Sequence, residues 1–534
     1  MRPSISAATD NDTALALWPT PGVAARDHEV EVKFSTDIAG LKEVSQSPIL
    51  ATATAFSAQD LRTVYFDTAA NDLWNHGMVL RLRTINGTDA VLCLKSTSAK
   101  AANPFCRREI EVPSPELQPN LGLFDRKLAS ALKRASRGRP LQAKFETRVR
   151  RETAAIKVAD AVIEIALDAG KIVIGEQKLD LSEVELELKS GEESALYDLA
   201  LQLADAHPLR LDFISKGQKG FLACTGQLPG VFEAPAHNLG PRATVDDAAR
   251  LVLSNTLGQF AGNWAAARET DNAEAIHQMR VAMRRLRSGL KMFKEDVASP
   301  QFDAFRADAK RIASALGPAR DCDVFQHKLL QGPLAQADRP SACAQLLAAV
   351  ESRRAAAYEV ARAILDARET TLFVLRAQKF LAGSGGRRGV PEDDPKSAER
   401  PARAFAKATL KRLHAHAAKR AEGYPHIAEE ARHKLRIALK ELRYGAEFLG
   451  GVFGRRRKVK SYIGRVAALQ DGLGAQIDIA SARHLLDSLV ETHGPELDRA
   501  AAYILGWLAR DASLAESTLG KSWKALKHTD VFWR

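Results

Sequence analysis

The sequence predicts an α+β protein with several domains, in which an N-terminal antiparallel β domain of about eight strands precedes a C-terminal all-α helical bundle that is internally duplicated. Three observations predict this class. Runs that alternate charged and apolar residues fill positions 29–222. A Gly- and Pro-rich stretch at 226–243 then loses all periodicity, as a linker does. Beyond it, apolar residues recur at helical spacing, and one helical pattern occurs twice, 156 positions apart.

Length and composition limit the classes of protein. A chain of 534 residues exceeds the size of a single core, so we expect two or three domains. The net charge of +12 favours polyanionic partners such as nucleic acid, polyphosphate or anionic lipid. No apolar run is long enough to span a bilayer, which predicts that the chain does not insert into a membrane. The five cysteines form no C-x-x-C pair, which is typical of a reducing compartment, so we expect a cytoplasmic protein.

Shifts in composition set the expected domain limits. The first 27 residues lack the basic and apolar regions of a signal peptide and predict a disordered leader. A second interruption, AGSGGRRGVPEDDPKSAERP, divides the helical part into two repeats. The expected divisions are a leader at 1–27, a β domain at 28–225, a linker at 226–243, a helical domain at 244–519 with repeats at about 244–381 and 403–519 around a linker at 382–402, and a C-terminal tail at 520–534.

The β domain begins with the run EVEVKF, in which successive side chains point to opposite faces of a strand. Glu29, Glu31 and Lys33 therefore share one face, and the apolar residues between them share the other. Taken alone, this pattern is typical of a half-exposed strand whose charged face lies in solvent.

The same alternation recurs in several later runs, and this changes the interpretation. The charged face is expected to carry Arg81, Arg83, Arg107, Glu109, Glu111, Arg148, Arg150, Glu164, Asp168, Glu185, Glu187 and Lys189. Several strands with charges of both signs on one face favour a closed barrel with a polar lumen, which is a β tunnel. Because burying a charge costs several kcal/mol, we expect these side chains to serve a function.

Six motifs in order carry a resemblance to a known family. They are E-x-E-x-K at 29–33, YFDT at 65–68, LRLR at 80–83, R-x-E-x-E at 107–111, E-x-E-x-K at 185–189 and SKGQKG at 215–220. This region resembles a CYTH domain, the triphosphate tunnel metalloenzyme fold. Two features depart from the pattern: Lys219 stands where such proteins often carry Arg, and 28 residues precede the first motif.

The resemblance implies roles for the charged residues. Carboxylates would hold Mg²⁺ or Mn²⁺, hard cations that prefer oxygen ligands, and the implied metal ligands are Glu29, Glu31, Glu109, Glu111, Glu185 and Glu187. Basic groups would bind phosphate oxygens, and the implied substrate-binding residues are Arg81, Arg83, Lys95, Arg107, Arg148, Arg150 and Lys216. The implied catalytic residues are Glu29, Glu31, Lys33 and Lys216. For Glu109 and Arg148, simple ion pairing inside the lumen is the alternative.

The helical part carries a basic stripe twice. In the run IHQMRVAMRRLRSGLKMF, the basic residues fall on one side of a helix and Met279, Met283, Leu286, Leu290 and Phe293 on the other. The second copy, RHKLRIALKELRYGAEFL, repeats this arrangement. One such helix is usually explained by a solvated basic face. Two copies in register favour stripes that converge on a long polyanion. The stripe residues are His277, Arg280, Arg284, Arg287, Lys291, His433, Arg436, Lys440 and Arg443.

The paired stripes and the motif LG-x-x-RD at 316–321 resemble the CHAD domain, a helical module associated with inorganic polyphosphate. The combined resemblance predicts metal-dependent hydrolysis of inorganic triphosphate to pyrophosphate and phosphate in the tunnel. It also implies that the stripe residues bind polyphosphate and that the protein associates with polyphosphate granules. The alternatives are a class IV-type adenylate cyclase, another nucleoside or thiamine triphosphatase, and a non-enzymatic polyphosphate-binding scaffold. Nucleic acid is disfavoured because the stripes lack aromatic residues that stack on bases.

Overall fold

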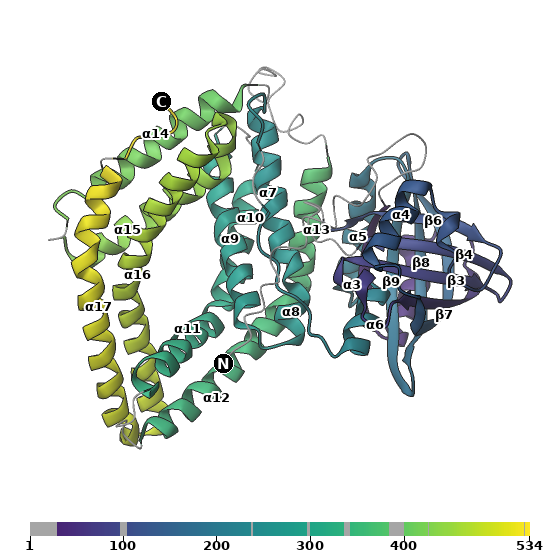
Figure 1. Cartoon of the computed structure of the whole chain (residues 1–534), viewed down its shortest axis with the longest axis horizontal. Helices are drawn as coiled ribbons and strands as arrows, with labels where there is room; N and C mark the ends of the chain where they lie inside the picture. The colour runs from purple at the N-terminus through teal and green to yellow at the C-terminus, as the bar shows by residue number, and fades with distance from the viewer. Residues whose placement is uncertain are drawn as a thin grey trace. The chain divides into compact units, whose positions relative to one another are not determined.

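The computed structural model describes residues 29–96, 104–235, 239–295, 300–335, 342–383, 400–424, 427–527 and 529–534. These residues divide into two compact units (Figure 1). A β unit contains residues up to Phe232 together with Ala261–Thr270 and Asp366–Gly383, and a helical unit contains the remainder. The expected leader at 1–27, and residues 384–399 of the expected linker at 382–402, lie outside the described residues.

The β unit is built mainly from strands. Its elements are β1 (Glu29–Ser35), α2 (Ile38–Ser45), β2 (Ser57–Asp67), α3 (Asp72–Asn75), β3 (Met78–Ile85), β4 (Asp89–Ser96), β5 (Cys106–Arg107), β6 (Glu109–Ser114), α4 (Arg126–Ala135), β7 (Gln142–Val158), β8 (Ala161–Ile174), β9 (Gln177–Ser190), α5 (Glu193–Ala206), β10 (Arg210–Leu211), α6 (Lys216–Thr225), α8 (Trp264–Glu269) and α13 (Arg368–Ala382).

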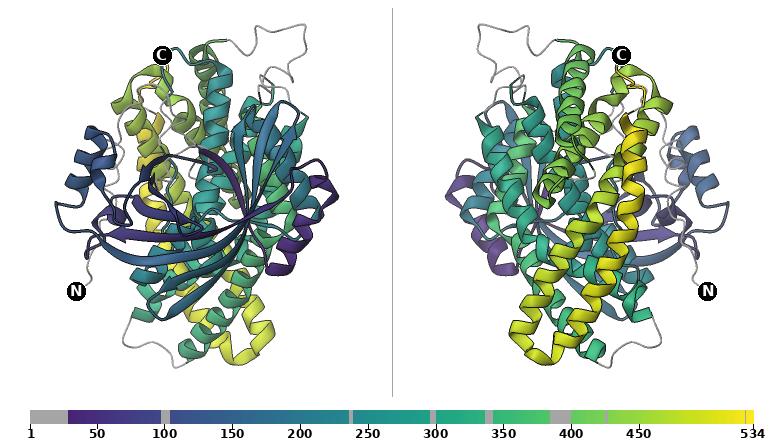
Figure 2. Two further views of the ribbon diagram at one scale, coloured as in Figure 1. Left: turned by 90° about the vertical axis from the view of Figure 1, so that its right-hand side faces the viewer. Right: turned by 90° about the vertical axis from the view of Figure 1, so that its left-hand side faces the viewer.

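All the strands belong to one antiparallel sheet of ten strands, in the order β10-β1-β9-β8-β7-β2-β3-β4-β6 with β5 paired to β1. The predicted fold class is confirmed, and the strand count differs slightly from the expected eight because β5 and β6 form one segment interrupted at Arg108 and β10 adds a short edge. Among the described residues the path of strands is not a closed ring, so the sheet is open where a closed tunnel was expected. Its two ends are nevertheless linked through one chain segment, since β5 pairs with β1 and β6 pairs with β4. The sheet curves strongly (Figure 2).

The two faces of the sheet have different partners. On one face, Leu80, Leu82, Leu92 and Leu94 pack with Leu128 and Leu132 of α4. Asp125 caps the N-terminus of this helix by accepting hydrogen bonds from two backbone N–H groups. We call the other face the inner face. It carries an apolar cluster near α6 and, beside this cluster, the charged residues of the site. The cluster consists of Leu61, Tyr65, Val79, Phe145, Val149, Ile172, Leu181 and Phe221.

The helices α8 and α13 pack within the β unit, although the sequence placed residues 261–270 and 366–383 in the helical domain or its linker. Trp264 of α8 stacks edge-on against Phe213, with ring centroids 5.4 Å apart. Lys379 of α13 pairs with Asp198 of α5. These contacts explain why the two helices join the sheet rather than the repeats that contain them in sequence.

The helical unit contains α7 (Val245–Gly262), α9 (Ala273–Phe293), α10 (Gln301–Ala315), α11 (Gly317–Gln331), α12 (Ala342–Asp366), α14 (Ala402–Arg420), α15 (Glu429–Leu449), α16 (Arg456–His493) and α17 (Asp498–Lys527). The expected tail at 520–534 begins inside α17, which ends at Lys527, and Leu526 near its end is buried. Among the described residues, none of the helices is long and apolar enough to cross a membrane.

The structure of the helical unit agrees with an internal duplication. Helices α9 and α15 are both 21 residues long, and they stand at the expected offset of 156 residues. The residues expected to pack are buried in both, among them Met283 and Leu290 in α9 and Leu435 and Leu442 in α15. The repeats also share a core, in which Leu329 of α11 and neighbouring residues of α12 pack with α16 and α17. The last two helices lie side by side (Figure 2).

Candidate active site and basic cluster

The two E-x-E-x-K motifs lie on neighbouring strands and face each other. In the register of β1 and β9, Glu31 stands opposite Glu187 and Lys33 stands opposite Glu185. Directly opposed residues of an antiparallel pair point to the same face. The alternation read from EVEVKF is therefore correct at this position, and both motifs contribute their charges to the inner face.

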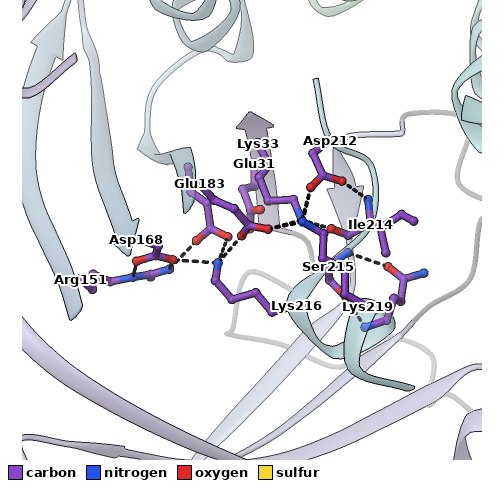
Figure 3. Close-up of polar contacts among 12 residues, drawn as sticks. Glu31, Lys33, Arg151, Asp168, Glu183, Asp212, Ile214, Ser215, Lys216 and Lys219 are labelled. Carbon is purple, nitrogen blue, oxygen red and sulfur yellow. Dashed lines mark hydrogen bonds and ion pairs between the residues drawn. The ribbon is translucent and has the colours of Figure 1, made fainter. Parts of the chain in front are cut away.

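Lys216 lies at the centre of a carboxylate cage on this face (Figure 3). Its Nζ is 2.7 Å from Asp168 Oδ2, 2.7 Å from Glu183 Oε2 and 2.6 Å from Glu185 Oε1. Asp168 and Glu183 are fully buried and stand opposite each other on β8 and β9. Arg151 closes the cage from β7, because its guanidinium donates two hydrogen bonds to Asp168 and one to Glu185. We call Asp168, Glu183 and Glu185 the Lys216 cage.

The helix α6 brings Lys216 into the cage. A capping box between Ser215 and Gln218 starts the helix directly before Lys216. Gly217 and Gly220 allow it to approach the inner face closely, since a Cβ on Gly220 would lie 2.0 Å from the ring of Phe145. The glycines of SKGQKG are therefore explained by packing, and the lysines of the motif extend from the docked helix.

A second group of charges adjoins the cage. Lys219 Nζ lies 2.7 Å from Glu183 and 2.6 Å from Asp212. Lys33 is buried, donates a hydrogen bond to the backbone carbonyl of Ile214, and lies 3.6 Å from Glu183. Although burial opposes ionisation, Lys33 and Lys219 hold the pKa of Asp212 well below its usual value. Four acids and four bases thus neutralise one another in this part of the inner face.

Lys95 forms the centre of a second cluster, contributed by β1, β4 and β6. Its Nζ is 2.9 Å from Glu29, 2.8 Å from Glu109 and 3.9 Å from Glu31. Arg81 reaches the same Glu109 at 2.5 Å. We call Glu29, Glu31, Glu109 and Arg81 with Lys95 the Lys95 cluster.

The pKa values in the Lys95 cluster reflect burial and competition for cations. Burial, together with the negative charges of Glu31 and Glu109, raises the pKa of Glu29 well above its usual value. Burial acts the same way on Glu109, but Arg81 and Lys95 outweigh it and lower the pKa of that carboxyl. Burial raises the pKa of the Cys93 thiol to about 12. The cysteine is therefore held as a neutral thiol beside Glu109.

The structure places the expected metal ligands in several different surroundings. Glu185 joins Asp168 and Glu183 in a group whose oxygen atoms lie within 4.8 Å of one another, and Glu109 and Glu111 form a similar group with Cys93. Glu29 and Glu31 belong to the Lys95 cluster, and Glu187 pairs with Lys189 at 2.7 Å. Sequence reasoning missed Glu183 as a site residue. Its signal was available, because SEVELELK continues the alternation of E-x-E-x-K by one step toward the N-terminus.

The expected position of Arg148 and Arg150 on the charged inner face is wrong. Their side chains point to the opposite face, where they are 68% and 61% exposed and pair with Glu146 and Glu152. Arg151, one residue later, occupies the inner face instead. The run RVRRE has arginines in both phases of a strand, so the alternation alone could not choose between them.

The other expected substrate-binding residues have varied surroundings. Arg83 lies on the inner face, 3.9 Å from Glu111. The backbone of Arg107, in β5, pairs with the backbone of Glu29, in β1. The Arg107 side chain lies outside the described part of the structure. Lys219 and Asp212 were not expected as site residues, and only the docking of α6 and the position of β10 bring them to the cage.

In the helical unit, the stripes of α9 and α15 come together. Burial and four nearby arginines lower the pKa of Lys440 to about 7. Two of the arginines, Arg280 and Arg284, belong to the first copy. The other two, Arg436 and Arg443, belong to the second. Burial and the cations Arg320, Arg284, Arg280 and Arg443 likewise lower the pKa of His277 to about 4. We call these five arginines, Lys440 and His277 the basic cluster.

The basic cluster gathers cations from both copies of the repeat, close enough to lower one another's pKa values. The Nε atom of Arg284 is buried and has no hydrogen-bond partner among the described residues. Burial, together with the cations Arg284 and Arg320, lowers the pKa of Arg280 even though Asp321 opposes this. Buried cations that repel one another are costly. Such a cluster is suited to binding an anion.

Not every stripe residue joins the basic cluster. Lys291 pairs with Glu441 at 2.7 Å and is 57% exposed, and His433 is exposed. Arg287 is half-buried, and no contact among the described residues assigns it to the cluster. Arg320 was not expected in the cluster because it belongs to neither stripe but to α11, in the motif LG-x-x-RD.

The glycines of the duplicated LG motifs lie against the arginines of the stripes. A Cβ on Gly317 would lie 2.6 Å from Nη1 of Arg280, which also donates a hydrogen bond to the carbonyl of Ala313 at 2.8 Å. A Cβ on Gly474 would lie 3.4 Å from Nη2 of Arg436. The same glycine–arginine contact thus occurs in both copies, more tightly in the first.

Comparison with known protein families confirms both resemblances. Residues 27–221 match the CYTH domain and residues 251–487 match the CHAD domain. The CYTH match falls within the β unit, whereas the CHAD match covers much of the helical unit and also includes α8 and α13, which pack within the β unit.

Curated relatives match parts of the chain. An uncharacterized protein of Mycobacterium tuberculosis is 29% identical over 330 residues, which are 56% of this chain and 59% of that protein. An inorganic triphosphatase of Haemophilus influenzae is 28% identical over 196 residues, which are 36% of this chain and 54% of that protein. The chain thus spans less than two thirds of the length of these relatives.

Solved structures that match parts of this chain include the CHAD domain from the plant Ricinus communis, which is 27% identical with a TM-score of 0.49. The match covers 56% of this chain and 98% of that one. Another is a putative adenylyl cyclase from Hippeastrum described as having a dominant triphosphatase activity. It is 19% identical with a TM-score of 0.27, and it covers 38% of this chain and 96% of that one.

Proposed function

We propose that the β unit is a metal-dependent triphosphatase that hydrolyses inorganic triphosphate to pyrophosphate and phosphate. The observation that carries this proposal is the Lys216 cage with its neighbours, where four acids and four bases meet on one curved face. Acids suit a divalent metal and bases suit phosphate oxygens. The match to the CYTH domain and the similarity to an inorganic triphosphatase support the same chemistry.

The residues of the cage fit a hard divalent cation. Their donor atoms are carboxylate oxygens within 4.8 Å of one another, and the ammonium of Lys216 already stands among them as a positive charge. Asp168, Glu183 and Glu185 would hold Mg²⁺ or Mn²⁺, and Glu29 and Glu31 would offer further oxygens. When bound, such a metal supplies an activated water and neutralises charge on the phosphoryl group.

The bases of the chain would bind and orient the substrate. Arg151 presents a planar guanidinium that can bind two phosphate oxygens at once, whereas Lys33, Lys216 and Lys219 act as point charges. Because these groups are largely buried, their attraction for phosphate oxygens is less screened than it would be at the surface. They would counter the charge that spreads over the equatorial oxygens as the terminal phosphate leaves.

An assay of the purified full-length chain tests this function. Phosphate release should be measured from inorganic triphosphate, ATP, thiamine triphosphate and long polyphosphate, each with Mg²⁺, with Mn²⁺ and with a chelator. We expect metal-dependent turnover of inorganic triphosphate that falls at least about a hundredfold in Glu185→Gln. The exposed Glu152→Gln is the matched control. Absence of turnover, or formation of cyclic AMP as the main product from ATP, would contradict the proposal.

We also propose that the basic cluster of the helical unit binds inorganic polyphosphate. The supporting observation is the convergence of cations from both copies on Lys440, with a buried donor of Arg284 left without a hydrogen-bond partner among the described residues. Binding of this kind would also bring the protein to polyphosphate granules.

Titration with labelled polyphosphate at fixed salt tests this second function. Arg284→Gln should weaken binding more than Lys291→Gln, because Lys291 is already neutralised by Glu441. Equal losses in the two variants would favour a diffuse electrostatic surface, and stronger binding of DNA than of polyphosphate would assign a different ligand to the cluster.

A further inference from the structure

We propose that Lys216 and Lys95 occupy the cation positions of the inner face while substrate is absent, so that a divalent metal binds tightly only when an anionic substrate draws these ammonium groups away. The inference rests on the proposed triphosphatase function and assigns these lysines a second role, as internal counter-ions that couple metal binding to substrate binding. It concerns the order and the interdependence of binding rather than the chemical step.

Lys216 fills the cage completely. An ammonium group has three N–H donors, and Lys216 Nζ lies 2.6–2.7 Å from one oxygen of each of the three cage carboxylates. These carboxylates are also a group whose oxygen atoms lie close enough together to hold a metal ion. A metal bound by all three would therefore compete with the ammonium for the same oxygens.

Lys95 lies among three carboxylates of the same face in a looser arrangement. Its Nζ contacts Glu29 and Glu109 at 2.9 and 2.8 Å and lies 3.9 Å from Glu31. The resemblance to CYTH domains assigned Glu29, Glu31 and Glu109 to a metal. Two lysines from separate elements, β4 and α6, thus each occupy a three-carboxylate position on the same face.

Charge balance explains why metal alone should bind weakly. Among the ion-paired groups of the cage and its immediate neighbours, Asp168, Glu183, Glu185 and Asp212 are offset by Lys33, Arg151, Lys216 and Lys219, so these charges cancel. Adding a divalent ion would leave a surplus of buried positive charge, which is unfavourable. A bound polyanion removes that surplus, because the displaced ammonium groups then pair with phosphate oxygens.

The geometry lets the lysine side chains move while the scaffold stays in place. A lysine ammonium sits on a flexible four-carbon stem, whereas α6 is fixed against Phe145 by Gly220. Arg151 is held by paired hydrogen bonds to Asp168 and is the less mobile cation. Since coupling between two ligands is reciprocal, metal should tighten substrate binding by the same factor by which substrate tightens metal binding.

Mn²⁺ binding to the full-length protein, followed by the electron paramagnetic resonance signal of free Mn²⁺, tests the inference without turnover. In the absence of any phosphate compound, Lys216→Met should lower the Kd for Mn²⁺ at least about tenfold, because an opposing charge leaves the cage. The matched control is Lys171→Met, which removes an equal charge from an exposed pair with Asp180. Circular dichroism verifies that both variants fold.

A second measurement uses the unmodified protein. Inorganic sulfate, a tetrahedral dianion, should lower the wild-type Kd for Mn²⁺ when compared with sodium chloride at equal ionic strength, and it should have a smaller effect in Lys216→Met. If Lys216→Met and Lys171→Met bind Mn²⁺ equally, the inference is wrong. If Lys216→Met does not fold, the absence of a sulfate effect in the wild type overturns it. Failure of the triphosphatase proposal would be distinct, because coupling would then persist without phosphate release.

Discussion

The contact between Gly317 and Arg280 gives a sharp test of the basic cluster. The substitution Gly317→Ala adds one methyl group to the start of α11, at a point 2.6 Å from Nη1 of Arg280. Carbon and nitrogen atoms need about 3.5 Å, so the guanidinium must move by roughly an ångström. That movement breaks its 2.8 Å hydrogen bond to the carbonyl of Ala313.

The expected effects on stability and on binding differ in size. Alanine favours the helix by up to about 1 kcal/mol over glycine, and loss of a hydrogen bond from a charged donor costs about 1.5–3 kcal/mol. The helical unit should therefore be destabilised by no more than about 3 kcal/mol. Polyphosphate binding should weaken about tenfold or more, because Arg280 loses a charge-assisted contact worth about 1.5–3 kcal/mol.

Two glycine variants are matched controls. Gly464→Ala lies in α16 with no atom within 4 Å of the added Cβ, so it should gain helix stability and leave binding unchanged. Gly474→Ala meets Arg436 only at the ordinary distance of 3.4 Å and should affect binding little. Fluorescence anisotropy with labelled polyphosphate, together with thermal unfolding, measures both quantities. The reasoning is refuted if Gly317→Ala binds as Gly464→Ala does, or if Gly474→Ala loses as much affinity as Gly317→Ala.

Three further predictions concern individual charges of the two units. Arg151→Gln should reduce triphosphate turnover by at least about a hundredfold in a phosphate-release assay. The turnover of Arg148→Gln should stay near that of the wild type. Equal losses of turnover would contradict the assignment of faces in β7. Glu183→Gln should destabilise the β unit by about 3–5 kcal/mol in chemical unfolding, because three lysines lose a shared buried partner. An unchanged unfolding transition would show that this buried pairing does not contribute to stability. Because burial and nearby arginines lower the pKa of Lys440 to about 7, the free protein holds it mostly neutral at pH 8 while bound polyphosphate favours its charged form. Polyphosphate affinity should therefore fall as pH rises from 6 to 8.5, and Lys440→Arg should flatten this dependence. Calorimetry in buffers of different ionisation enthalpy should detect proton uptake when polyphosphate binds.

The sequence was most informative where its pattern had one interpretation. The run EVEVKF has its charges in a single phase, so its alternation alone assigns Glu31 and Lys33 to one face. The helical stripes were equally clear, since two copies in register repeat the same apolar face. In both cases the periodicity of the backbone determines which side chains share a face, and that property is local.

Only the tertiary structure decided which charges meet. In β7, arginines occupy both phases, and the pairing of that strand with β2 and β8 selects Arg151 over Arg148 and Arg150 for the inner face. The positions of Lys219 and Asp212 depend on the docking of α6 and the short pairing of β10, which local periodicity does not contain.

The helical unit gives the same result for Arg320, which belongs to no stripe and reaches the basic cluster because α11 packs on α9. The sequence by itself therefore determined the fold class, the duplication and the kinds of charged group that the site would use. The structure decided the phase at ambiguous positions and the partners of each buried charge. The physical reason is that a local repeat fixes the direction of a side chain, whereas the partner of a charge depends on elements distant in sequence that pack together.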